Sequence, residues 1–125
     1  MLDKKDYNDS LVGIDWHLDV HTPYRKCYDA YVEGDAFLCA DCKTKWDVPY
    51  YMPYRCLYSR NIDNLFIAGR NISVTHDALG PVRVMRTCGM MGEAVGKAAY
   101  LCKEYGLKPD GVYQNKIEEL KNFFK

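Results

Sequence analysis

Residues 64–96 have the sequence NLFIAGRNISVTHDALGPVRVMRTCGMMGEAVG, and this stretch decides the fold that we expect for the 125-residue chain. It opens with a nearly continuous apolar run, residues 64–69, which is typical of a short strand covered on both faces. A loop is expected to follow from Arg70 to Arg86, and a helical pattern comes next. A strand covered on both faces implies layers of structure above and below it.

A long helix is predicted from Thr87 to Tyr105, with Thr87 as its N-cap and Gly106 just past its C-terminal end. Apolar residues recur along it at helical spacing, so they form one face that can be buried. The members of this face are Met91, Ala94, Val95, Ala98, Leu101, Cys102 and Tyr105.

A second stripe of the same helix carries Gly89, Gly92 and Gly96. Glycine inside a helix costs about 1 kcal/mol relative to alanine, so three glycines within two turns need a reason. The stripe predicts that something approaches the helix closely. Two alternatives are open, another stretch of backbone or a flat cofactor.

The N-terminal half is predicted to be rich in β-structure. Trp16, Leu18 and Val20 alternate with polar residues, which is the pattern of a half-buried strand. Residues 26–39 predict a hairpin whose short loop, residues 33–35, contains a glycine.

Residues 54–58 predict a further strand, and residues 115–124 predict a short terminal helix. The composition changes near residue 50, so we divide the chain into a β-rich segment, 1–48, and a segment with the long helix, 49–125. The expected fold class is α+β, with a hairpin in the first half and then a strand, a loop and a long helix.

The composition excludes some classes of function. Seventeen basic residues balance seventeen acidic ones, so nothing favours binding to nucleic acid or to an anionic membrane. The sequence has neither a run of about 20 apolar residues nor a secretion signal, which predicts a soluble chain with its compartment left open. Most of the six cysteines are expected to be small buried hydrophobic residues.

The stretch 64–96, with residues 53–57 ahead of it, closely resembles the C-terminal FAD-binding segment of a bacterial family of FAD-dependent oxidoreductases. Some members of that family carry a xanthan lyase label. The resemblance implies that residues 49–125 form the C-terminal part of a Rossmann-like FAD-binding domain, and that residues 1–48 lie on the substrate side. It also implies FAD as cofactor, a small-molecule substrate, and the cytoplasm or periplasm of a bacterium as location.

In flavoproteins of this kind the helix after the last strand points its N-terminus at the flavin ring. Its free N–H groups and the positive end of its dipole favour the negative charge of a reduced flavin. We therefore expect Thr87 to Met90 to supply the donors. The cofactor-binding residues that the resemblance implies are Gly69, Arg70, Asn71, Arg86, Thr87, Cys88, Gly89, Met90 and Gly92.

Arg70 departs from the wider flavoprotein pattern, which often has an acidic residue at this position. Its guanidinium either faces a phosphate or pairs with an acidic neighbour, and both alternatives are open. His76, Arg83 and His17 are the candidate catalytic residues. An imidazole can move a proton near neutral pH, and a guanidinium can hold a carboxylate. A histidine used only in surface hydrogen bonds is the plainer alternative.

The sequence contains no Gly-x-Gly-x-x-Gly turn, the motif that holds the pyrophosphate of a dinucleotide. We therefore expect weak FAD binding or none by this chain alone, with the nucleotide end supplied by an N-terminal part or by a partner chain. An apolar, glycine-rich surface facing the flavin makes self-association an additional expectation.

Two other functions are weighed against this one. Cys39 and Cys42 form a CxxC that could join His17, His21 and Cys27 in a zinc site, but a single CxxC is a weak signal and no metal site is predicted. Eleven tyrosines could stack on sugar rings in a non-catalytic carbohydrate-binding domain, although tyrosines serve packing more often.

Overall fold

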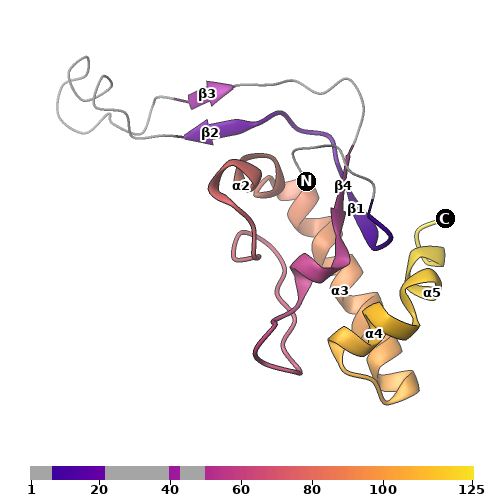
Figure 1. Ribbon diagram of the computed structural model, residues 1–125. Coiled ribbons are helices and arrows are strands. Elements are labelled where there is room, and N and C mark those ends of the chain that lie inside the picture. Colours follow the sequence, from indigo (N-terminus) through magenta and orange to yellow (C-terminus); the bar gives the residue numbers. More distant parts are fainter. Residues whose placement is uncertain (1–6, 22–39, 43–49) are drawn as a thin grey trace.

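The computed structural model describes residues 7–21, 40–42 and 50–125, and the side chains of 7–20 and 50–125. Short antiparallel sheets and several helices make up this part (Figure 1), so the expected α+β class is confirmed at this level. The strands are β1 (Ser10–Ile14), β2 (Asp19–His21), β3 (Ala40–Cys42) and β4 (Tyr50–Pro53). The helices are the 3-10 helix η1 (Tyr54–Leu57), α2 (His76–Val82), α3 (Met85–Tyr105), α4 (Pro109–Asn115) and α5 (Ile117–Asn122).

Two antiparallel pairs form the sheets. β1 pairs with β4, with Val12 opposite Met52 and Ile14 opposite Tyr50, and β2 pairs with β3. Figure 1 shows that α3 runs behind β1 and β4, while α4 and α5 lie at the far end of α3 from β2. Strands from both halves of the chain therefore share one core with the long helix.

The predicted long helix is confirmed, with a different start. Met91, Ala94, Ala98 and Leu101 are completely buried in the core. Gly106 ends the helix in the left-handed region, with φ of 62°. The helix begins at Met85 after Val84, so the prediction of an N-cap at Thr87 was wrong.

The predicted face also extends too far at its last turn, where Tyr105 is 44% exposed. The hydroxyl of Tyr105 reaches outward and donates to the carboxylate of Glu119 at 2.8 Å. An aromatic ring with a polar end can lie at a surface without cost when that end is satisfied.

The strand predicted at residues 54–58 is wrong, because this segment forms η1. The backbone N–H of Tyr54 donates to the Asp9 carbonyl at 2.8 Å, and that of Arg55 donates to the Asp9 carboxylate at 3.1 Å. These bonds use the backbone N–H groups that a strand would need for pairing with a neighbouring strand. Burial raises the pKa of Tyr54, whose hydroxyl donates to the Pro109 carbonyl at 2.9 Å and joins η1 to α4.

The strand predicted at residues 64–69 is also wrong. Only an isolated bridge between Phe66 and Tyr58 forms, and Leu65 is 40% exposed. Within the described residues no further strand lies beside this segment. A continuous apolar run forms a central strand only when neighbours cover both of its sides.

The predicted loop from Arg70 to Arg86 contains the helix α2. Thr75 caps it, with its hydroxyl oxygen accepting from the Ala78 N–H at 3.4 Å. Gly80 and Pro81 are both buried inside α2. The terminal helix predicted at 115–124 is shorter, and α4 precedes it.

The N-terminal predictions are confirmed in part. Leu18 and Val20 are buried and β2 begins at Asp19, but Trp16 is 45% exposed and lies ahead of the strand. The hairpin predicted within residues 26–39 lies outside the described residues. Of the six cysteines, the three with described side chains, at positions 56, 88 and 102, are half-buried.

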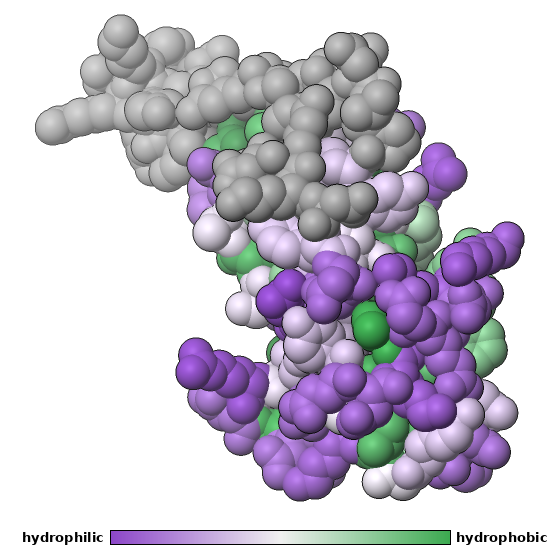
Figure 2. Space-filling view, turned by 45° about the vertical axis from the view of Figure 1, so that its right-hand side comes forward, coloured by the Kyte–Doolittle hydropathy of each residue, from purple (hydrophilic) through white to green (hydrophobic). Residues whose placement is uncertain are grey.

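The surface carries no dominant apolar patch on the face in Figure 2, where hydrophobic spots lie apart among hydrophilic side chains of the described residues. Among the described residues, no helix has both the length and the apolar character needed to span a membrane.

Candidate functional site

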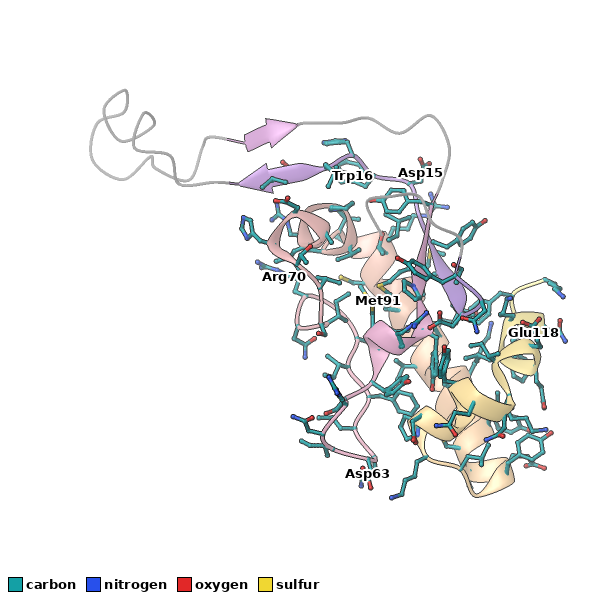
Figure 3. All side chains as sticks on the ribbon, in the orientation of Figure 1. Asp15, Trp16, Asp63, Arg70, Met91 and Glu118 are labelled. Carbon is teal, nitrogen blue, oxygen red and sulfur yellow. The ribbon has the colours of Figure 1, made fainter. Side chains whose placement is uncertain are left out.

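A groove lies where the end of β1 meets the start of α3. Its volume is about 490 Å³, within the range of about 300–1,000 Å³ that is usual for small-molecule sites. Asp15 and Trp16 lie along one edge, in the connection between β1 and β2 (Figure 3). The described lining residues are Gly13, Asp15, Trp16, Val84, Arg86, Thr87 and Met90.

The first turn of α3 gives this groove hydrogen-bond donors. In a helix that begins at Met85, the N–H groups of Met85, Arg86 and Thr87 have no acceptor inside the helix. The N–H of Cys88 already donates to the Val84 carbonyl at 2.9 Å. The donors predicted at Thr87 to Met90 therefore lie two residues earlier in the chain, and of the predicted set only Thr87 remains.

Thr87 is the most buried polar group of the groove, with 3% of its surface exposed. Its hydroxyl has no hydrogen-bond partner within the described part of the chain. The buried side-chain oxygens that lack a partner in the described residues do not include this one, so solvent or a ligand can reach it.

A second, smaller hollow of about 140 Å³ lies between α2 and β2. Arg83 donates from Nη2 to Oδ2 of Asp19 at 3.2 Å across it. The described lining residues are Asp19, Val20, Arg70, His76, Leu79, Gly80 and Arg83.

The predicted site residues divide between these two places. Arg86, Thr87 and Met90 line the groove, and Arg70, His76 and Arg83 line the smaller hollow. His17 belongs to neither lining and stacks on the Trp16 ring at 4.7 Å between centroids. The other predicted cofactor-binding residues, which also line neither, are Gly69, Asn71, Cys88, Gly89 and Gly92.

Sequence reasoning missed Gly13, Asp15, Trp16 and Asp19 as site residues. Asp15 follows directly on the apolar run of β1, and a polar residue at the end of a buried strand is a recognisable signal for a site. Gly13 gives no such signal, because only the packing of β1 against α3 brings it into the lining of the groove.

The glycine stripe of α3 is exposed. A Cβ built on Gly89, Gly92 or Gly96 meets nothing within 4 Å, so no backbone among the described residues packs there. The alternative that another backbone of this chain explains the stripe is wrong for that part of the chain. Contacts among the described residues therefore do not explain why this helix carries three glycines.

Replacing Gly92 with alanine is expected to stabilise the isolated chain. The added methyl meets no atom, and alanine is favoured over glycine in a helix interior by about 0.5–1 kcal/mol. Urea unfolding followed by circular dichroism at 222 nm would measure the gain. A loss of stability in Gly92→Ala would show that a part of the chain outside the described residues packs on the stripe.

Comparison with known protein families matches residues 1–123 to a family described as FAD dependent oxidoreductase. The chain belongs to this family. Searches of curated proteins and of solved structures found no match. Membership confirms the resemblance at the level of the family. The cofactor of this family is FAD.

Zinc remains untested as an alternative. No group of three or more possible metal ligands gathers among the described residues. Cys27 and Cys39 lie outside that part of the chain, as do the side chains of His21 and Cys42.

Proposed function

We propose that this FAD dependent oxidoreductase chain supplies the flavin-ring end of an FAD site, in an enzyme that oxidises or reduces a small molecule. The groove between β1 and α3 carries the proposal. It combines the open N-terminal turn of α3, the Thr87 hydroxyl, which has no partner among the described residues, and the exposed Trp16 ring in a space of about 490 Å³. A flat aromatic group with one polar edge matches this lining.

The residues of the groove fit a flavin ring by their chemistry. Trp16 can stack on a flat ring, while Thr87 and the first N–H groups of α3 can bond its polar edge. Arg86 adds a positive charge near any negative charge that develops there. When FAD is bound, its ring accepts or donates the hydride of the reaction.

The exposed faces support the view that this chain needs a further part of the enzyme. The sequence has no Gly-x-Gly-x-x-Gly turn, so a partner chain or an N-terminal part would hold the pyrophosphate. In a complete Rossmann-like domain, neighbouring layers would cover residues 64–69 and the stripe at Gly89 to Gly96. Self-association through these faces is the competing arrangement.

His76, Arg83 and His17 are proposed as the residues that act on the substrate. His17 is stacked on Trp16, at the edge of the groove, where it could exchange a proton with a bound molecule. Arg83 and His76 lie in the adjacent hollow, where they could hold or protonate a second part of that molecule.

Titration of the purified chain with lumiflavin, a flavin ring without phosphates, tests the proposed site. We expect weak saturable quenching of flavin fluorescence, about tenfold weaker in Trp16→Ala because a stacking partner is lost. Tyr100→Ala is the control, since Tyr100 is 56% exposed and lines no part of the groove.

The same titration with FAD tests the claim that the nucleotide end lies elsewhere. FAD should bind no more than about tenfold more tightly than lumiflavin, because this chain has few contacts to offer the phosphates and adenine. Stoichiometric retention of FAD through purification would contradict the incomplete site. Lumiflavin affinity unchanged by Trp16→Ala would instead contradict the groove as the ring site.

A further inference from the structure

We infer that the hollow between α2 and β2 is a binding site for the anionic group, carboxylate or phosphate, of a small molecule. Two guanidinium groups, those of Arg70 and Arg83, face a hollow whose described lining contains one carboxylate, that of Asp19. Among the described lining residues the cationic charge therefore exceeds the anionic charge. A small bound anion would compensate this excess of positive charge.

Arg83 is the fixed part of this site. Its hydrogen bond to Asp19 holds the guanidinium in one orientation, and both side chains are about three-quarters buried, at 28% and 23% exposed. A guanidinium carries five N–H donors in a planar fork, and this bond uses one of them. The remaining donors suit the paired oxygens of a carboxylate or phosphate.

Arg70 is the open part of the site. It is exposed, has no ion-pair partner within the described residues, and lies on the segment that leads into α2 (Figure 3). Gly69 before it takes a positive φ of 96°, and Ile72 after it is buried in the core. Ile72 therefore anchors the turn in the core, and Arg70 lies at the rim of the hollow.

The floor of the hollow is rigid because α2 rests directly on the β2 backbone. A Cβ added to Gly80 would lie 2.5 Å from the Asp19 carbonyl oxygen, so only glycine permits this approach. The volume of about 140 Å³ equals that of about four or five waters, each taking about 30 Å³ in the liquid. This space suits a carboxylate or phosphate group.

The hollow adjoins the groove proposed for the flavin. Arg83 lines one and Val84 the other, and Trp16 and Asp19 are three residues apart, at most about 11 Å along the chain. If the proposed function is correct, the anion is the acidic group of the substrate, a carboxylate or a phosphate. Anion binding itself does not depend on that function.

The test is a titration of the isotopically labelled full chain with sodium phosphate and, separately, with sodium acetate, followed by amide chemical shifts. Sodium chloride at matched ionic strength corrects for screening. We expect saturable shifts at Gly80 and Arg83. Arg70→Gln should weaken binding about threefold to tenfold, the usual effect of losing one charged hydrogen bond near a surface.

Arg60→Gln is the matched control, because Arg60 is also exposed but lines a different hollow, near Asp63. It should leave the affinity unchanged. Arg83→Gln gives a second measurement and should abolish the saturable shifts. Arg70→Gln keeps the test decisive if loss of the Arg83–Asp19 pair unfolds the chain, since Arg70 supports no part of the core.

Binding of acetate would support a carboxylate ligand, and binding of phosphate alone would support a phosphate ligand. The absence of saturable shifts with both anions, or equal affinity in Arg70→Gln and the unmodified chain, would overturn the inference. The lumiflavin titration separates the two proposals. Lumiflavin binding without anion binding would contradict the anion site and leave the proposed function standing. Anion binding without lumiflavin binding would contradict the proposed function and leave the anion site standing.

Discussion

Replacing Asp9 with asparagine is expected to lower the free energy of unfolding by about 2–4 kcal/mol. Asp9 is completely buried, and its carboxylate accepts three hydrogen bonds from Arg55: from the backbone N–H at 3.1 Å, from Nε at 3.0 Å and from Nη2 at 2.8 Å. An asparagine amide can replace only part of this set. Arg55 would lose the charge that its guanidinium faces.

The lower end of this range is favoured by the partial exposure of Arg55. Its side chain is 44% exposed, so water can solvate the guanidinium after the pair is broken. The rings of Tyr7 and Tyr113 each lie 5.4 Å from the guanidinium carbon and would still hold part of it in place.

Asp63→Asn is the control for the Asp9 experiment. Asp63 also pairs with a cation, Lys108, but both side chains are more than 60% exposed. Solvent screens an exposed pair, so the urea midpoint of Asp63→Asn should barely move. Similar midpoints for Asp9→Asn and Asp63→Asn would show that the buried pair does not stabilise this fold.

The same Asp9 contacts explain one limit of prediction from this sequence. Residues 54–58 have the composition of a strand, but their backbone N–H groups are taken by a residue 46 positions away along the chain. Local patterns hold no information about such a partner. The long helix was predictable because its face repeats every three to four residues, and that spacing requires no knowledge of the rest of the molecule.

The candidate site also combines residues that local patterns can predict with residues that only distant contacts bring in. Arg86, Thr87 and Met90 could be placed together from the sequence, because the first two turns of one helix present them all. The sequence could not show that Asp15 and Trp16 lie beside these residues. They are about 70 positions away along the chain, and they reach the groove only because β1 pairs with β4 and packs against α3. Likewise, Arg70 and Arg83 were each candidates for an anion, but only the packing of α2 on β2 shows that they line one hollow.

Replacing Gly80 with alanine is expected to destabilise the chain by about 1–3 kcal/mol, although alanine is the better helix former. The new methyl would lie 2.5 Å from the Asp19 carbonyl oxygen, 2.9 Å from its carbonyl carbon and 3.1 Å from its nitrogen. All three are backbone atoms, which cannot rotate away as a side chain could. The helix α2 must therefore move off β2.

Gly92→Ala is the matched control, because it makes the same substitution in a helix interior with no atom within 4 Å of the new methyl. Urea unfolding should give opposite signs for the two variants, a loss for Gly80→Ala and a gain for Gly92→Ala. Moving α2 also separates Arg83 from Asp19, so Gly80→Ala should lose the saturable acetate or phosphate shifts while Gly92→Ala retains them. A gain of stability in both variants would mean that α2 does not rest on β2 in solution.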